Sequence, residues 1–153
     1  MPGTAVWRIS RTKAGRSRAL ASHDIAFAPE LLTGPVWTVA SGREVTFQLL
    51  DLPKPPTAIF CFNDRIALGC HEALAERGLR VPEDVSVIGF DNDYIAATLR
   101  PPLTTMILPH EEMARWAVAE LLDRAALGRP LSPARIKIDC DLILRGSVAR
   151  PKV

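Results

Sequence analysis

The chain has 153 residues, of which 48% are hydrophobic and 24% are charged, as expected for one ordinary soluble domain with a single core. The net charge of +2 excludes a strongly acidic or basic protein, and the five basic groups within residues 1–20 are interpreted as a solvated helix face rather than an arm for nucleic acid. No apolar stretch is long enough for a signal peptide or a membrane span, so secretion and membrane insertion are not expected. Three cysteines without CxxC spacing (Cys61, Cys70 and Cys140) fit the reducing cytoplasm.

The first part of the chain alternates helical segments with short apolar ones. Residues 12–21 suit a helix, and residues 36–39 (VWTV) suit a short strand. Ser41 and Glu44 then have the spacing of a capping box, which predicts the start of a second helix. Three prolines within residues 53–56 cannot continue that helix, so they predict a connector.

A buried strand and a capped helix follow the connector. Residues 58–62 (AIFCF) form an unbroken apolar run, which is typical of a strand covered on both faces. Asn63 and Asp64 then provide a cap for a helix over residues 65–77. Gly78 is predicted to close this helix, because glycine readily adopts the left-handed conformation found after helix ends.

The second part of the chain continues the alternation. Residues 85–90 (VSVIGF) form a second buried run, which ends in the polar sequence Asp91-Asn92-Asp93. The elements expected after it are a short helix to Leu99, an extended segment over residues 103–108, an amphipathic helix over residues 109–127 and a last strand whose apolar residues alternate from Ile136 to Leu144. Strands that alternate with helices predict an α/β fold, with a parallel sheet flanked by helices, in a single domain over residues 1–153.

Polar residues follow both buried strands at the point where each strand ends. In an open parallel sheet, ligands bind beyond the carboxyl ends of the strands, where helix N-termini and short loops converge. Asn63, Asp64 and Asp91 are therefore expected at one edge of the sheet. An amide beside a carboxylate can donate to and accept from the vicinal hydroxyls of a sugar or nucleoside. The residues alone leave open whether Asn63 or Asp64 does this or only caps its helix.

Three motifs carry a resemblance to a known family. They are PTAIFCFNDRIALGCHEALAERGLRVPEDVSVIGFDN, then PPLTTM, then LILRGSVA near the end of the chain. In order and spacing, this string resembles the C-terminal sensing half of LacI/GalR transcription regulators, over about residues 11–150. The resemblance implies the C-terminal subdomain of a type I periplasmic-binding-protein-like fold, in which two α/β subdomains close on a small effector. It also implies that the subdomain is incomplete here.

The resemblance also implies roles for individual residues. Asn63 matches the asparagine of the family's NDxxA motif, and Asp91 matches the aspartate of its GFD motif, both of which commonly contact the effector. Asp64 is included in the expected effector site. Trp37 matches an aromatic residue that can stack on a sugar face, with a place in the core of a strand as its alternative.

Parts of the family pattern lie outside this chain. Family members begin with a helix-turn-helix and a first subdomain, so contact with DNA is expected only through that absent helix-turn-helix. Residues 5–9 (AVWRI) are the candidate replacement for the first strand of the sheet. The helix of residues 109–128 is expected to pack on the missing N-terminal subdomain. Leu68 and Leu99 fall where the family places homodimer contacts, and burial inside the monomer is the equal alternative for both.

The function expected from the sequence is effector sensing and dimerisation in a cytoplasmic regulator, without catalysis, cofactor or membrane. One alternative is an enzyme that uses Asp64 and Asp91 as paired carboxylates around Mg²⁺, although no glycine-rich phosphate loop precedes either helix. A second alternative is a secreted solute-binding protein of the same fold, against which the missing signal segment argues. The three histidines (His23, His71 and His110) lack metal-ligand spacing, so no metal site is expected.

Overall fold

The computed structural model describes residues 5–7, 19–26, 28–33, 36–127 and 135–150. Its regular elements, in chain order, are β1 (Ala5–Trp7), the 3₁₀ helix η1 (Pro29–Leu31), α2 (Val39–Leu50), β2 (Ala58–Phe60), α3 (Asp64–Glu76), β3 (Ser86–Asp91), α4 (Tyr94–Thr98), β4 (Thr104–Ile107), α5 (His110–Leu127) and β5 (Leu142–Ile143). Most of the helix predicted over residues 12–21 lies outside the described residues. The part that is described, residues 19–21, is helical. The other predicted helices are present, with ends that differ by a few residues.

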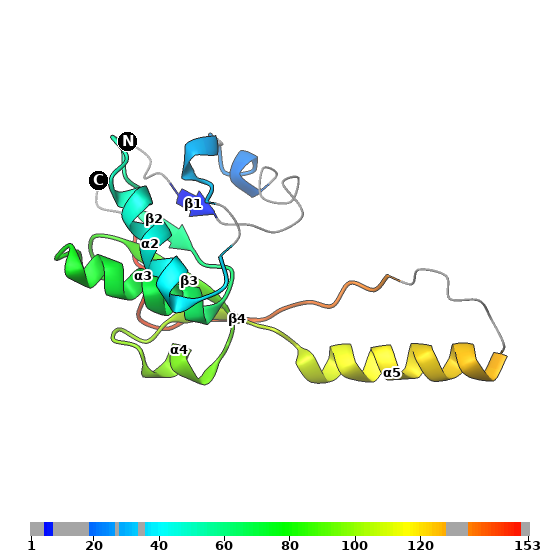
Figure 1. Ribbon diagram of the computed structural model, residues 1–153. Coiled ribbons are helices and arrows are strands. Elements are labelled where there is room, and N and C mark those ends of the chain that lie inside the picture. The colour runs from blue at the N-terminus through cyan, green and yellow to red at the C-terminus, as the bar shows by residue number, and fades with distance from the viewer. Residues whose placement is uncertain (1–4, 8–18, 27, 34–35, 128–134, 151–153) are drawn as a thin grey trace.

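The described strands form one sheet in the order β1-β2-β3-β4-β5, of which Figure 1 labels β1 to β4. Strands β1 to β4 are parallel, and β5 pairs antiparallel with β4. The replacement strand predicted over residues 5–9 is confirmed over Ala5–Trp7, where Val6 lies opposite Ile59 of β2, and residues 8–9 lie outside the described residues. Each of the buried segments AIFCF and VSVIGF contributes a strand, and these strands are neighbours. The predicted α/β class with a parallel sheet and flanking helices is therefore confirmed.

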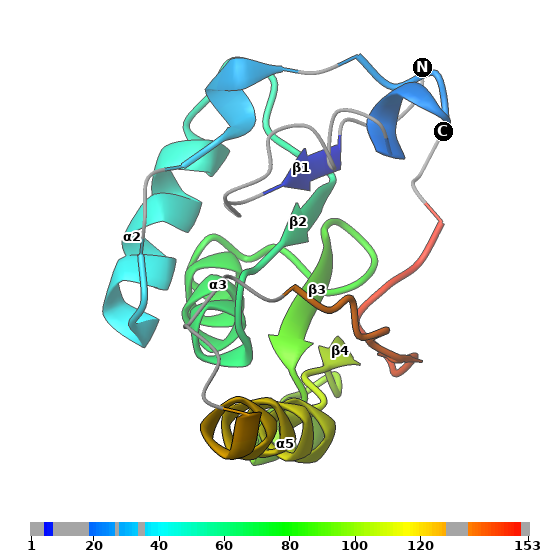
Figure 2. The same ribbon diagram turned by 90° about the vertical axis from the view of Figure 1, so that its right-hand side faces the viewer.

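Helices α2 and α3 lie side by side on one face of the sheet (Figure 2). Their close approach depends on small residues, since a Cβ atom at Gly69 of α3 would overlap the backbone oxygen of Val39 and lie 2.7 Å from the backbone nitrogen of Arg43. A Cβ atom at Gly42 of α2 would likewise lie 2.6 Å from the backbone oxygen of Ile66. The glycines thus let the backbones of α2 and α3 approach more closely than any residue with a Cβ atom at these two positions would allow.

The start of α2 differs from the prediction. The segment 36–39 is not a strand, because Thr38 is the N-cap of a helix that begins at Val39. The capping box joins Thr38 and Ser41, with each side chain accepting a hydrogen bond of 3.1 Å from the other residue's backbone N–H. The sequence predicts Ser41 as the N-cap with Glu44 as its partner three residues later. In the structure Thr38 is the N-cap and Ser41 is the partner, so the helix begins earlier.

The hydrophobic core lies between the sheet and α3. Ile66 and Leu74 of α3, Val87 of β3 and Leu103, which precedes β4, are its largest apolar side chains with almost no exposure. At the end of α3, Gly78 has a φ of 68°, the left-handed conformation that the sequence predicted after this helix. The core therefore fixes α3, and with it the residues at the helix's N-terminus.

The last two elements extend away from the sheet. Helix α5 projects from the body of the molecule, and residues 135–141 return alongside it (Figure 1). The strand predicted from Ile136 to Leu144 is wrong in extent, because only Leu142–Ile143 pairs with β4. Several large apolar side chains here are exposed to between 42% and 64%, namely Met113, Val118, Leu121, Leu122 and Ile136.

Candidate functional site

The carboxyl ends of β2 and β3 lie next to each other, as the sequence predicted. Phe60 of β2 is opposite Ile88 of β3, and the backbone N–H of Cys61 donates to the Ile88 oxygen at 2.8 Å. Asn63 follows β2 after a short bend, and Asp91 is the last residue of β3. The two residues therefore leave the sheet at the same edge, which we call the rim.

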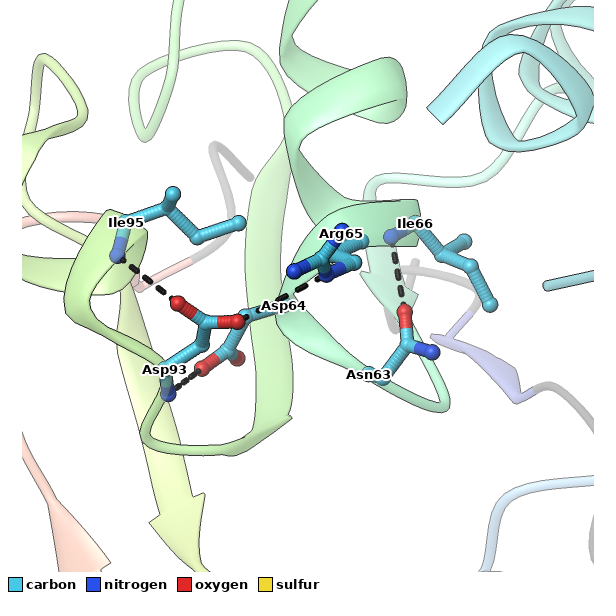
Figure 3. Close-up of polar contacts among 6 residues, drawn as sticks. All are labelled: Asn63, Asp64, Arg65, Ile66, Asp93 and Ile95. Carbon is cyan, nitrogen blue, oxygen red and sulfur yellow. Dashed lines mark hydrogen bonds and ion pairs between the residues drawn. The ribbon is translucent and has the colours of Figure 1, made fainter. Parts of the chain in front are cut away.

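Asn63 caps α3 through its side-chain oxygen, which leaves its Nδ2 group available as a donor. Its Oδ1 accepts a hydrogen bond of 2.8 Å from the backbone N–H of Ile66, which satisfies a free donor of the helix N-terminus (Figure 3). No residue in the described part of the chain hydrogen-bonds to the Nδ2 group of Asn63. The two interpretations left open by the sequence are thus compatible, because the oxygen caps the helix and the nitrogen remains a donor.

Asp91 has an unusual backbone conformation. Its φ is 107°, and Asn92 has a φ of 55°, both in the region that favours glycine. Non-glycine residues in such conformations are strained by about 1–3 kcal/mol and cluster at ligand sites. Burial raises the pKa of the half-buried Asp91 carboxyl; the nearby His110 lowers this pKa, while Asp93 raises it. Among the described residues, none hydrogen-bonds to this carboxylate.

Asp64 lies beneath the rim rather than on it. It is 0% exposed, and its two oxygens accept hydrogen bonds of 2.7 Å from the Thr105 hydroxyl and 2.7 Å from the Asp93 backbone N–H (Figure 3 shows the second). Desolvation raises the pKa of the Asp64 carboxyl, an effect that these two hydrogen bonds oppose and that the charge of Asp91 reinforces. Both carboxylate oxygens of Asp64 are therefore occupied by partners within the chain.

Asp93 connects the loop after β3 to two helices. Its Oδ1 accepts from the Ile95 backbone N–H at 3.3 Å, which caps α4, and its Oδ2 lies 3.6 Å from Nε of Arg65 on α3 (Figure 3). Asn92 is held from another side, because Arg145 donates to its Oδ1 at 2.8 Å. Residues 91–93 are therefore tied to α3, α4 and the segment after β5.

Trp37 lies close to the rim with its ring accessible. Its side chain is 61% exposed, which excludes the alternative of a strand core position. It packs edge-on against Phe62, with ring centroids 5.3 Å apart and an angle of 84° between the planes. Trp37 therefore packs against the residue that directly precedes Asn63.

The family model of the periplasmic binding protein-like domain matches residues 2–148. The chain belongs to this family. The HTH-type transcriptional repressor CytR of Escherichia coli K12 is 41% identical over 133 residues, which cover 87% of this chain and 39% of the repressor. CytR and the solved LacI-family regulators described next identify the LacI/GalR type of periplasmic binding protein-like domain, as the sequence motifs predicted.

Solved structures agree with this membership. A sugar-binding LacI-family regulator from Escherichia coli, in complex with phosphate, has a TM-score of 0.82 at 34% identity and aligns with 97% of this chain and 56% of its own. A LacI-family regulator from Enterococcus faecium with bound ribose has a TM-score of 0.79 at 27% identity and aligns with 97% of this chain and 57% of its own. This chain thus spans little more than half of the solved LacI-family regulators and about two fifths of CytR.

Two residues of this LacI/GalR-type domain were predicted at a dimer interface. Leu68 on α3 is half-buried, and Leu99 is half-buried and packs against the core as the C-cap of α4. Each side chain keeps some exposed surface within the chain described here. Their part in dimerisation therefore stays a prediction.

A cavity of about 280 Å³ lies between α5 and the segment that returns beside it. Its lining is apolar and is formed by Leu108, Pro109, Met113, Trp116, Ile136, Ile138 and Cys140. No group of three or more histidine, cysteine, aspartate or glutamate side chains in the described ranges is arranged to hold a metal ion. Within the same ranges, no helix combines the length and apolarity needed to cross a membrane.

Sequence reasoning missed two residues that support the rim. Thr105 and Arg145 both lie within the quoted motifs, PPLTTM and LILRGSVA, but no local pattern connects either to the loop after β3. Thr105 is 0% exposed, although threonine commonly stays at the surface. The sequence signal for Thr105 is a polar residue within a segment predicted to be a strand of the sheet, because a polar side chain that is buried there needs a hydrogen-bond partner.

Proposed function

We propose that this domain senses a small hydroxyl-bearing effector for a transcription regulator and that the rim binds this effector. In this proposal Asp91 accepts hydrogen bonds from hydroxyl groups, Asn63 donates one from Nδ2, and Trp37 covers an apolar face of the ligand. The observation that carries the proposal is the Asp91 carboxylate, which is held in strained backbone and hydrogen-bonded to no described residue. Backbone strain of this kind persists only where the surrounding structure holds it, and such residues cluster at ligand-binding and active sites.

The ligand class follows from the chemistry of these groups. A carboxylate, an amide and an indole together suit a molecule with adjacent hydroxyls and a flat apolar face, as in a pentose or a ribonucleoside. The ribose bound to the Enterococcus faecium relative supports this class. The domain is proposed to act without catalysis or cofactor, because relatives such as CytR are transcriptional repressors. A cytoplasmic location is proposed because the sequence has three cysteines without CxxC spacing.

The partners of the domain are part of the same proposal. CytR is longer than this chain, and the exposed apolar side chains of α5 are proposed to pack on the part of the regulator that corresponds to its additional length. Homodimer contacts are proposed for Leu68 and Leu99. Binding to DNA is proposed to belong to the helix-turn-helix of the regulator and not to this domain.

The test is binding of D-ribose and uridine to the 153-residue chain, measured by calorimetry and by the shift in its unfolding temperature. At a ligand concentration 100 times the Kd, binding should stabilise the wild-type chain by about 2.7 kcal/mol. Asp91→Asn should lower the affinity at least about tenfold, because a charge-assisted hydrogen bond is lost. Asp84→Asn is the matched control, since Asp84 precedes the same strand at its other end and should leave binding unchanged.

A second variant separates the two functions of Asn63. Asn63→Asp keeps an oxygen that caps α3, so the stability of the chain should change little. It removes the Nδ2 donor and places a negative charge beside the bound hydroxyls, so affinity should fall as it does in Asp91→Asn. Unchanged ligand binding in both variants, or a wild-type chain that binds neither ribose nor uridine, would count against the proposed function.

A further inference from the structure

The strained loop that presents Asp91 is held at two points. Asp64 accepts a hydrogen bond of 2.7 Å from the Asp93 backbone N–H, and Arg145 donates one of 2.8 Å to the Asn92 side chain. These anchors act on the two residues that directly follow Asp91. They come from separate parts of the fold, since Asp64 begins α3 and Arg145 follows β5.

The first anchor is rigid because Asp64 is itself fixed. The Thr105 hydroxyl of β4 donates to its Oδ1 at 2.7 Å, and the carboxylate is fully buried. Strand β3 leaves room for the Asp64 carboxylate at Gly89. A Cβ atom at Gly89 would overlap Oδ1 of Asp64 and lie 2.8 Å from Cδ2 of Leu103. The sequence thus places a glycine where the carboxylate must pass to reach the Asp93 N–H.

The second anchor is equally constrained. The guanidinium of Arg145 donates to the Leu103 backbone oxygen at 2.8 Å as well as to Asn92, and its backbone N–H donates to the Thr104 hydroxyl at 3.0 Å. A planar guanidinium with two fixed partners has little freedom to rotate. Arg145 therefore connects the loop after β3 to the backbone at the start of β4.

We propose that Asp64 and Arg145 are positioning residues, which hold residues 91–93 in the strained conformation that directs the Asp91 carboxylate towards the effector. This inference rests on the proposed function. Without the anchors, Asp91 is expected to relax towards an ordinary negative φ, which turns its carboxylate away from the rim. A carboxylate and a guanidinium that touch no effector would then control its affinity.

The test compares Asp64→Ala with Asp64→Asn. Asparagine keeps an oxygen for the Asp93 N–H and can donate to the Thr105 hydroxyl, whereas alanine does neither. Amide exchange of Asp93, followed by NMR relative to Val87, whose N–H donates to the Ser147 oxygen at 2.8 Å, should be at least about tenfold faster in Asp64→Ala. In Asp64→Asn it should stay within about threefold of the wild type.

Two further readouts connect the anchors to Asp91. D-Ribose affinity should fall about tenfold in Asp64→Ala and largely recover in Asp64→Asn. The NMR titration of the Asp91 carboxyl should move towards the ordinary aspartate range in Asp64→Ala, because the loop no longer buries it. Asp84→Ala is the matched control; Asp84 also accepts a backbone hydrogen bond, from Arg80 at 3.0 Å, and its loss should leave all three readouts unchanged.

The outcomes separate this inference from the proposed function. If Asp64→Ala folds with unchanged Asp93 exchange and an unchanged Asp91 titration, or weakens the loop without weakening ribose binding, Asp64 is not a positioning residue. If Asp64→Ala does not fold, Arg145→Met tests the second anchor through Asn92, and both the ribose affinity and the Asp91 titration should change as in Asp64→Ala. If the wild-type chain binds neither ribose nor uridine while exchange and titration follow the variants, the loop anchors are confirmed and the assignment of the ligand fails.

Discussion

His71 gives this domain a predictable sensitivity to acid. The residue lies on α3 with an exposed fraction of 9%, and its buried Nε2 atom has no hydrogen-bond partner among the described residues. Burial lowers the pKa of His71 from its ordinary value of 6.5 to about 4, because the apolar surroundings disfavour the charged imidazolium. Since the folded pKa is depressed, the neutral histidine's contribution to stability is full above pH 6.5 and is lost as the pH falls from 6.5 towards 4.

The size of the effect follows from the two pKa values. At pH 7 the ring is mostly neutral in both the folded and the unfolded chain, so the free energy of unfolding is almost unaffected. At pH 5 the unfolded chain binds the proton and the folded chain mostly does not, which lowers the free energy of unfolding by about 2 kcal/mol relative to pH 7. This is a large part of the stability of an ordinary domain.

The assay is urea unfolding of the wild-type chain and of His71→Met at pH 7, 6 and 5. Methionine has a similar volume and no titrating group, so the variant should be equal to the wild type or slightly more stable at pH 7, where an unpaired buried nitrogen has been removed. Between pH 7 and pH 5 the variant should lose about 2 kcal/mol less than the wild type. The raised pKa values of Asp64 and Asp91 act in the opposite direction, but they are present in both proteins and cancel. Parallel pH profiles for the two proteins would refute the reasoning.

Three further predictions concern packing and the rim. Gly69→Ala should destabilise the chain by about 3 kcal/mol in urea unfolding, because its Cβ meets backbone atoms of α2. Gly78→Ala meets no described residue within 4 Å and should cost only about 1 kcal/mol from its positive φ. Trp37→Ala should weaken ribose binding about fivefold in calorimetry and leave the unfolding temperature almost unchanged, because the ring is already 61% exposed. Ribose affinity should fall on acidification at a higher pH than an ordinary aspartate would give, because the pKa of Asp91 is raised, and this dependence should be absent in Asp91→Asn.

The sheet and its rim could be predicted because their signals are local. The runs AIFCF and VSVIGF have the apolar character of buried parallel strands, and each is followed at once by polar residues. Parallel pairing of the two strands then brings Asn63 and Asp91 to one edge without further information. The α3 helix was equally predictable, since its cap and the glycine that ends it both lie in the adjacent sequence.

The last predicted strand shows where local pattern fails. Apolar residues alternate from Ile136 to Leu144, yet only Leu142–Ile143 pairs, because its neighbour β4 is a short strand that ends at Ile107. An extended segment needs a backbone partner to become a strand, and Ile107 donates its N–H to the Asp141 oxygen at 2.8 Å as the last such contact. Beyond that point the same alternation directs Ile136 and Ile138 into the cavity beside α5.

Adjacent residues at the start of α3 show why sequence could propose the rim but not its support. Asn63 is the N-cap in extended backbone, whereas Asp64 is the first helical residue, so their side chains leave the chain in different directions. Asn63 therefore keeps its Nδ2 donor at the rim, and Asp64 points beneath it, where the acid is also favoured by the positive end of the helix dipole. The partners that give Asp64 its place, Thr105 and Asp93, are 41 and 29 residues away in sequence. Local spacing can predict a ligand group at a strand end, but only the folded sheet shows which buried neighbour holds it in place.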